Sequence, residues 1–314
     1  MRVVEIQGYG GPEVVGEAER PDPRPQPGRV LVRVAAAEIN PVDLWAREGL
    51  LRGAVPGLEP PFVAGWNLAG TVLGAAEGFV AGQPVVGLIP WFGVAADGIG
   101  GHAEIVSAEP GWLAPLPAGV DPVPAVTLGL NATTAVQALD LLDVGKGRTL
   151  LVVGASGAVG GFAVQLAASA GVDVIAAAGG PDDEAYLAEL GAGRVLPRTA
   201  PEELADAVRA LEPAGVDAVL DAALLGAPVL GAVRDGGVFV SASAPTAPAP
   251  ERGIQVQAVS VHPDSAQLAA LASDFAAGRL RTRVVETFPF RAAQDAHRVA
   301  GTHGLRGRVV LTTD

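Results

Sequence analysis

Residues 149–160 read TLLVVGASGAVG, an apolar run followed by a glycine-rich turn, and this stretch decides the fold. Helix-forming residues follow at 162–170, and a second apolar run occupies 172–178. The order strand, turn, helix, strand is typical of a dinucleotide-binding βαβ unit, in which glycines let the backbone approach a pyrophosphate at the amino terminus of the helix. Gly157 and Gly160 have the spacing of the last two glycines of the G-x-G-x-x-G fingerprint, and Ala155 takes the place of the first.

This pattern marks a candidate coenzyme loop, although a tight turn in a parallel sheet with no ligand has a similar sequence. If the loop binds a coenzyme, the contacts come from the residues between the strand and the helix. The candidate coenzyme-binding residues here are Gly154, Ala155, Ser156, Gly157, Ala158 and Val159.

The size and charge of the chain narrow its possible functions. Its 314 residues are enough for about two domains, and hydrophobic residues make up 49%, so a large core can form without disulfides. The formal net charge of −13 argues against nucleic acid as a partner, because phosphate binding needs clustered Lys and Arg. No apolar run reads as a membrane span, and the first residues, MRVVEIQGYGG, do not resemble a signal peptide. We therefore expect a cytoplasmic protein with no membrane partner.

The sequence offers little for a metal centre. It contains no cysteine, which excludes disulfides, a thiol nucleophile and thiolate zinc ligands. Its four histidines, at positions 102, 262, 297 and 303, show no ligand spacing. We therefore expect no metal bound by side chains of this protein.

Changes of pattern along the chain predict two domains. Residues 1 to about 120 alternate short apolar runs with turn residues, which predicts a mainly β domain. From about residue 121 strands alternate with helices, beginning with a long helix over 124–142, which predicts a parallel sheet covered on both faces. A proline-rich segment at 243–252 is typical of a linker, and strands and helices alternate again beyond it.

Five further motifs are spread over almost the whole chain. They are INPVD at 39–43, PFVAGWNLAGTV at 61–72, GGHAE at 100–104, GVDAVLD at 215–221 and GRVVL at 307–311. Together with the glycine-rich loop, they resemble the signatures of the zinc-independent medium-chain dehydrogenase/reductase superfamily, and within it the quinone oxidoreductase and enoyl reductase branch.

The resemblance implies an α/β protein in which a Rossmann domain, a doubly wound parallel sheet, is inserted in a mainly β, GroES-like substrate domain. The Rossmann domain is expected at 123–245 and the substrate domain at 1–122 plus 246–314, with the active site in the cleft between them. The resemblance further implies an NAD(P)H-dependent oxidoreductase, usually a homodimer. Its small-molecule substrate would be a quinone, or an α,β-unsaturated carbonyl compound whose C=C bond is reduced without zinc.

At four positions the chain departs from the family pattern. Trp45 stands where the family often has a tyrosine, so a phenol that could donate a proton is missing. Asn67 and Gln83 replace two aspartates, and His102 replaces a tyrosine. These losses keep open the alternative of a non-catalytic nucleotide-binding or structural protein. A zinc-free alcohol dehydrogenase is a further alternative, although no proton-relay Tyr–Lys pair is evident.

Reduction of such a substrate needs a donor for the developing enolate oxygen, since the coenzyme supplies the hydride. The candidate catalytic residues are Asn40, Asn131 and Thr134, of which Thr134 resembles the family threonine near the nicotinamide. Two of them have a structural alternative, because Asn40 can cap its own backbone and Thr134 can bond to a preceding helix carbonyl. Asp43 is expected to cap the helix that follows it.

The candidate substrate-pocket residues are Trp45, Arg47, Trp66 and Trp91. Core packing is the alternative for the tryptophans, and a solvated position on a helix is the alternative for Arg47. The loops at 48–60 and 91–99 are expected to face the pocket. His102 could titrate near neutral pH, although the family residue at this position is mainly structural.

The predicted coenzyme depends on the end of the second strand. An NAD site would carry a carboxylate there for the ribose diol, but this strand ends AAAGG at 176–180. Asp182 and Asp183 follow a proline, where we expect them to cap a helix. Arg198 follows the third strand, where the resemblance places a residue beside the 2′-phosphate, and Arg194 is a weaker choice. We therefore predict NADP(H), without excluding NAD(H). Two further candidate coenzyme-binding residues lie at strand ends, Gly179 and Ser241.

Overall fold

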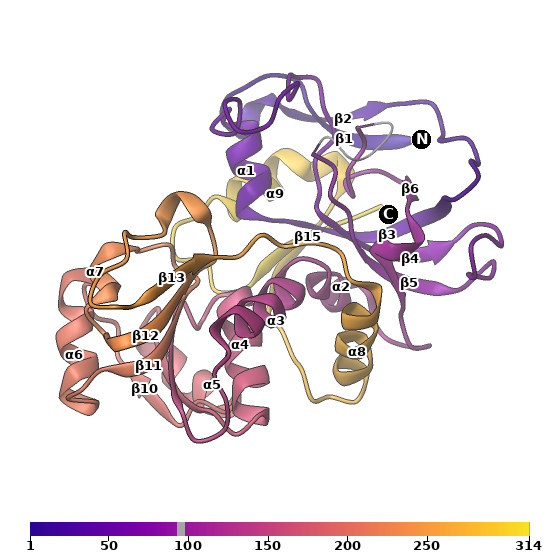
Figure 1. The fold of residues 1–314 in the computed structure, drawn as a ribbon. Coiled ribbons are helices and arrows are strands. Elements are labelled where there is room, and N and C mark those ends of the chain that lie inside the picture. Colours follow the sequence, from indigo (N-terminus) through magenta and orange to yellow (C-terminus); the bar gives the residue numbers. More distant parts are fainter. Residues whose placement is uncertain (93–97, 314) are drawn as a thin grey trace. The chain divides into compact units, whose positions relative to one another are not determined.

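The computed structural model describes residues 1–92 and 98–313, and contacts between residues divide the chain into two compact units. Unit 1 consists of Met1–Leu130 and His262–Asp314, and unit 2 consists of Asn131–Val261 (Figure 1). Unit 2 is thus inserted between two segments of unit 1. Because each unit buries its own apolar residues, each is described by itself.

Unit 2 contains a six-stranded sheet in which all neighbouring strands are parallel. Its strands are β8 (Thr149–Val153), β9 (Asp173–Ala177), β10 (Arg194–Leu196), β11 (Val216–Asp221), β12 (Val233–Ser241) and β13 (Gln255–Ala258). Its helices are α3 (Asn131–Leu142), α4 (Ala158–Ser169), α5 (Glu184–Glu189), α6 (Leu204–Leu211) and α7 (Ala227–Leu230). The order β10-β9-β8-β11-β12-β13 is the 3-2-1-4-5-6 order of a doubly wound dinucleotide-binding sheet, which confirms the predicted fold class.

The apolar strands of unit 2 are buried on both faces. Leu151, Val219 and Phe239 form one core cluster with residues of α6 and α7. Leu150 and Leu220, which point to the opposite face, are equally buried. In Figure 1, α3 and α4 lie on that opposite face of the sheet. Burial on both faces explains why the strands read as continuous apolar runs and not as alternating patterns.

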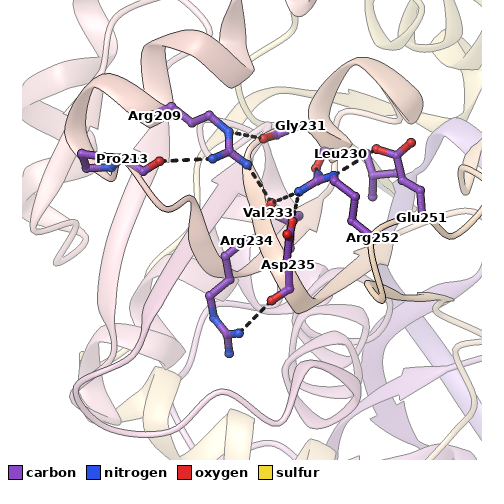
Figure 2. Close-up of polar contacts among 9 residues, drawn as sticks. All are labelled: Arg209, Pro213, Leu230, Gly231, Val233, Arg234, Asp235, Glu251 and Arg252. Atoms are coloured by element: carbon purple, nitrogen blue, oxygen red, sulfur yellow. Dashed lines mark hydrogen bonds and ion pairs between the residues drawn. The ribbon is translucent and has the colours of Figure 1, made fainter.

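Two arginines stabilise the start of β12 (Figure 2). Arg209 of α6 donates to the carbonyl oxygens of Gly231 and Val233 at 2.8 and 3.2 Å. Arg252 donates to the carbonyl oxygens of Leu230 and Val233 at 2.9 and 3.0 Å. These hydrogen bonds fix the connection between α7 and β12 by satisfying its carbonyl groups.

Unit 1 is mainly β. Its strands are β1 (Arg2–Ile6), β2 (Val15–Glu19), β3 (Val30–Ile39), β4 (Asn67–Val72), β5 (Pro84–Leu88), β6 (Ile105–Ala108), β7 (Leu113–Pro115), β14 (Val284–Pro289) and β15 (Arg308–Thr312). Its helices are α1 (Pro41–Arg47), α2 (Pro122–Ala125), α8 (Ser265–Ala276) and α9 (Ala293–Ala300). The main sheet has the order β14-β15-β3-β4-β5-β7, with β6 also paired to β3. Only β14 and β15 pair in parallel, and β1 and β2 form a separate ribbon.

Both limits of unit 2 lie later in the chain than the predicted 123 and 245. At the first limit, α2 and the 3₁₀ turn Val126–Leu128 pack on strands β3 and β4 of unit 1. At the second, the chain beyond the prolines adds β13 to the parallel sheet by pairing with β12. Composition shows the proline-rich segment but not this pairing, so a boundary placed at the prolines falls too early.

The predicted helix over 124–142 is interrupted at Gly129. A Cβ at this position would lie 2.4 Å from the carbonyl oxygen of Gly87, so glycine lets the backbone pack directly on β5. By length and composition, Pro122–Leu142 is also apolar enough to cross a membrane, yet 72% of its most apolar window is buried inside the protein. Helices in protein cores meet the same criterion, so its apolar sequence is consistent with packing.

Candidate active site

The glycine-rich loop joins β8 to α4 at the carboxyl edge of the parallel sheet. Gly154 has φ +75°, a conformation that favours glycine, and Gly157 donates its N–H to the Gly154 carbonyl at 3.0 Å. Gly157 is also the N-cap of α4, and no side chain caps this 12-residue helix. The backbone N–H groups of its first turn can therefore bind an anion, which fits the diphosphate of a dinucleotide.

Close packing of the backbone shapes this loop. A Cβ at Gly160 would lie 2.3 Å from the carbonyl oxygen of Gly154, and one at Gly154 would lie 2.9 Å from the nitrogen of Ala223. Ala155 is fully buried, so its methyl group points into the core and does not narrow the loop. This explains how alanine can replace the first glycine of the fingerprint. The residues present fit a dinucleotide, with Ser156 and Gly157 placed to bind it.

Gly179, just beyond β9, is bonded through both its backbone groups. Its N–H donates to Oγ of Ser156 at 3.1 Å, and its carbonyl accepts from Nη1 of Arg198 at 3.0 Å. The Arg198 side chain is exposed at this position. Arg194, the weaker candidate for a phosphate ligand, is instead held in ion pairs with Asp173 and Glu212 at 2.6 and 2.7 Å. Of the two arginines, Arg198 is thus the one whose side chain reaches the residues just beyond β9.

The prediction that Asp183 caps a helix is wrong. Asp183 occupies the N-cap position of α5, but its side chain makes no capping hydrogen bond. The residue is fully buried, and its Oδ2 lies 3.3 Å from the position that a Cβ of Gly179 would take. A carboxylate therefore lies at the end of β9 after all, because the chain turns back at Pro181.

Two further polar residues end the neighbouring strands. Ser241, at the end of β12, is fully buried, and its hydroxyl donates to the carbonyl of Ser243 at 2.9 Å, so it shapes the turn that follows. Asp221, at the end of β11, is not among the sequence candidates. It is also fully buried, its Oδ2 accepts the N–H of Gly226 at 2.7 Å, and burial raises its pKa. Its place as the last residue of the GVDAVLD motif is the signal that could have identified it.

The three candidate catalytic residues come from both units. Asn131 and Thr134 lie in the first turn of α3 in unit 2, where both are buried. Asn40 lies in unit 1, where it is the N-cap of α1 and is 1% exposed. The role of all three in catalysis stays a prediction.

Asn40 belongs to a buried polar network in unit 1. Its Nδ2 donates to Oδ1 of Asn67 at 3.2 Å, and Asn67 donates to Oε2 of Glu38 at 2.5 Å. Glu38 is fully buried, and its Oε1 lies 2.9 Å from Nε of Arg308. The carboxylate that the resemblance leads us to expect at position 67 is therefore supplied by β3, the strand beside it.

Contrary to the sequence prediction, Asp43 does not precede α1 but is its third residue, and its side chain completes a capping box whose N-cap is Asn40. Its carboxylate accepts the N–H of Asn40 at 2.8 Å and the N–H of Gly65 at 3.1 Å. The residue is fully buried, and this burial raises its pKa to about 7 in spite of the two hydrogen bonds.

His102 is a buried residue and not a solvated acid. Its Nε2 lies 3.0 Å from the carbonyl oxygen of Glu38, and its ring packs edge-on against that of His297. Burial lowers the pKa of His102 to about 4, so the ring is neutral at pH 7. A general acid at neutral pH would have to come from another group.

The candidate pocket residues do not share one cavity. Trp91 is 3% exposed, stacks on Phe62, and lines a cavity of about 370 Å³ in unit 1. Among the residues that the structure describes, Trp45, Arg47 and Trp66 do not line this cavity. Residues 93–97 of the predicted pocket loop lie outside the described part of the chain.

Arg47 is neither solvated nor in that cavity. It is 3% exposed, donates to the carbonyl of Gly10 at 3.1 Å and pairs with Glu48 at 2.6 Å. Trp45 and Trp66 are half-buried, and the Trp66 ring packs edge-on against Phe92 at 5.1 Å between ring centres. Trp45 and Trp66 thus pack against neighbouring residues and remain partly accessible to solvent.

Within residues 1–92 and 98–313, no group of three or more His, Cys, Asp or Glu could hold a metal ion.

Two family models match the chain. One, described as the alcohol dehydrogenase GroES-like domain, matches residues 26–118, and the other, described as zinc-binding dehydrogenase, matches residues 190–311. Because the first falls in unit 1, it supports the GroES-like assignment of the mainly β domain.

The chain is also similar to curated oxidoreductases. It is 32% identical to a chloroplast envelope quinone oxidoreductase homolog of Arabidopsis thaliana over 64% of this chain and 62% of that protein. It is 36% identical to an acrylyl-CoA reductase of Ruegeria pomeroyi over 54% of this chain and 52% of that protein. These matches span less than two thirds of either relative.

A solved structure extends the similarity over the whole chain. The crystal structure of an NAD-dependent alcohol dehydrogenase superposes with a TM-score of 0.84 at 28% identity, covering 100% of both chains.

Proposed function

Because this chain belongs to the medium-chain dehydrogenase/reductase superfamily, on its quinone oxidoreductase-like branch, we propose that it is an NAD(P)H-dependent oxidoreductase. Its proposed substrate is a quinone, or an α,β-unsaturated carbonyl compound whose C=C bond is reduced without zinc. The observation that carries this proposal is the loop between β8 and α4. There the missing side chain of Gly160 and the uncapped start of α4 fit a dinucleotide at the carboxyl edge of the sheet.

The protein's part in such a reaction is binding and orientation. When bound, the nicotinamide coenzyme supplies the hydride. The first turn of α4 binds the diphosphate through its backbone N–H groups. Asn131 and Thr134 of α3, and Asn40 of unit 1, are the side chains proposed to donate a hydrogen bond to a developing enolate oxygen.

We propose NADPH as the preferred coenzyme, because Arg198 is exposed at the end of β9 with one N–H on the carbonyl of Gly179. A guanidinium in this place can bind the 2′-phosphate that distinguishes NADPH from NADH. The test is the dissociation constant of each coenzyme by calorimetry for the wild type and Arg198→Ala. We expect NADPH to bind at least tenfold more weakly to the variant and NADH to bind nearly unchanged. Arg24→Ala, which removes an exposed charge from unit 1, is the control. Unchanged NADPH binding would refute the assignment.

Substrate assays separate the reductase from its alternatives. NADPH consumption with a panel of quinones and enones is expected for the proposed activity. Oxidation of alcohols with NADP⁺, in the absence of that activity, would favour a zinc-free alcohol dehydrogenase, which the similarity to an alcohol dehydrogenase structure keeps in view. Coenzyme binding without turnover of any substrate would favour the non-catalytic alternative.

We also propose a homodimer that forms through β13, an edge strand of the six-stranded sheet. Val259 donates its N–H to Ser241 of β12, so the N–H of Ala258, one residue earlier, points away from β12. Unpaired edges of this kind can pair with another chain. Ala258→Pro removes an outward donor and leaves the pairing with β12 intact. We expect light scattering to show a dimer for the wild type and a monomer for Ala258→Pro; a dimeric variant would exclude this edge.

A further inference from the structure

Strands β8 and β11 end side by side in the sheet of unit 2. Their last residues, Val153 and Asp221, are partners in the parallel register, and the N–H of Ala222 donates to the carbonyl of Val153 at 3.0 Å. The chain adds β9 and β10 on one side of β8 and then crosses to its other side to form β11. The strand order therefore reverses between β8 and β11, and a dinucleotide binds outside the carboxyl ends of the strands at such a point.

The loop at 222–226, which follows β11, packs directly on the glycine-rich loop, which follows β8. A Cβ at Gly154 would lie 2.9 Å from the nitrogen of Ala223 and 3.0 Å from the carbonyl carbon of Ala222. The two loops are thus in backbone contact at a point where glycine leaves the necessary room. Ala223 is nevertheless exposed, so the 222–226 loop also presents a surface to solvent at this edge of the sheet.

The conformation of the 222–226 loop depends on support from outside its own backbone. Leu224 has φ +61°, a left-handed conformation that is unfavourable for a residue with a side chain and persists only where neighbouring groups hold it. Oδ2 of Asp221 accepts the N–H of Gly226 at 2.7 Å, so the residue before the loop is bonded to the last residue of the loop. Because Asp221 is fully buried, this hydrogen bond is shielded from water.

We propose that Asp221 is a positioning residue of the coenzyme site, which holds the 222–226 loop against Gly154 as a second wall beside the glycine-rich loop. This role rests on the proposed function, because it concerns the same coenzyme. Asp221 is buried beneath the loop and acts through it, without touching the coenzyme. When its carboxylate is removed, the loop adopts other conformations, and the coenzyme binds only the fraction of molecules in which the wall is in place.

The test is the dissociation constant of NADPH, measured by calorimetry on the full chain. Asp221→Ala removes the acceptor of the Gly226 N–H and should weaken binding about tenfold or more. Asp221→Asn keeps the shape of the side chain and an uncharged acceptor, so the loss should be only about threefold.

Asp217→Ala is the matched control. Asp217 lies near the other end of the same strand, where its carboxylate accepts the N–H of Thr149 at 2.9 Å and pairs with Arg234 at 2.8 Å. Both alanine variants should lower the melting temperature, since each loses a carboxylate that accepts a backbone N–H. Asp217→Ala should change the NADPH dissociation constant less than about twofold, because it alters the opposite edge of the sheet. A merely structural role of Asp221 would leave the two variants with the same affinity for NADPH.

Should Asp221→Ala fail to fold, Ala223→Trp carries the test. The new ring would project from an exposed position of the proposed wall and should weaken NADPH binding about tenfold or more by a clash with the coenzyme. Its control is Ala210→Trp, at an exposed position in the last turn of α6. Unchanged NADPH binding by Ala223→Trp would overturn the inference, because the loop would then not border the coenzyme.

The role of Asp221 and the proposed function fail in different ways. If NADPH binds the wild type, Asp221→Ala and Asp217→Ala equally, the role of Asp221 is wrong and the proposed function stands. If neither NADPH nor NADH binds the wild type at millimolar concentration, the proposed function fails and the role of Asp221 fails with it.

Discussion

Two adjacent glycines at the start of α4 allow a direct test of the loop geometry. A Cβ at Gly160 would lie 2.3 Å from the carbonyl oxygen of Gly154, whereas the nearest atom to a Cβ at Gly161 is Cδ1 of Leu190 at 3.5 Å. The first contact is a clash with backbone, and the second is an ordinary van der Waals contact. Gly160→Ala and Gly161→Ala should therefore have opposite effects on stability.

The magnitudes follow from two contributions. In a helix, alanine is more favourable than glycine by up to about 1 kcal/mol, and this gain applies at both positions. At Gly160 the new methyl group must also displace the loop backbone, and overpacking of this kind typically costs about 1–3 kcal/mol, occasionally more. We expect Gly160→Ala to lower the free energy of unfolding by about 2 kcal/mol and Gly161→Ala to raise it by about 0.5–1 kcal/mol.

Urea unfolding followed by circular dichroism measures both changes, and calorimetry with NADPH measures the consequence for the loop. Because the displaced backbone is the part that approaches the diphosphate, Gly160→Ala should weaken coenzyme binding at least tenfold, while Gly161→Ala should leave it unchanged. If both variants unfold at the same urea concentration and bind the coenzyme equally, the close approach of Gly160 to Gly154 is not what shapes this loop.

Three further predictions concern stability. The pKa of His102 is lowered from 6.5 to about 4, so His102 should lower the free energy of unfolding as the pH falls through this range. The pKa of Asp43 is raised from 3.8 to about 7, so Asp43 should lower the free energy of unfolding as the pH rises through that wider range. In urea titrations at several pH values, Asp43→Asn should therefore make the free energy of unfolding fall more steeply toward acid pH. Arg252→Ala should cost about 1–2 kcal/mol in thermal unfolding, because the carbonyls at the start of β12 lose a charged donor; an unchanged melting temperature would contradict this. Glu38→Gln should cost about 3 kcal/mol or more, since a mostly buried arginine loses its carboxylate, and adding Asn67→Asp should recover part of the loss.

The sequence alone predicted an element correctly wherever the residues that determine it lie in one short segment. The strand predicted over 149–153 coincides with β8, and the glycine-rich turn that follows it leads into α4 as predicted, because apolar runs and glycine spacing are properties of neighbouring residues. The start of α1 is a partial case, since the local sequence indicates a cap there, but the N-cap is Asn40 and Asp43 is the third residue of the helix. The resemblance of five motifs to a known family, supported by the later comparisons, then established the two-domain architecture.

Only the tertiary structure decided which distant residues meet. Asp183 lies beside Gly179 because the chain turns back between them. Asn67 can replace an aspartate because Glu38 of the neighbouring strand supplies the carboxylate. The extent of unit 2 likewise depends on the pairing of β13 with β12, well beyond the prolines that mark the linker. Sequence patterns record the preferences of a residue and its neighbours along the chain. Charge compensation, burial and strand pairing depend on neighbours in space, which is why these features became visible only in the folded chain.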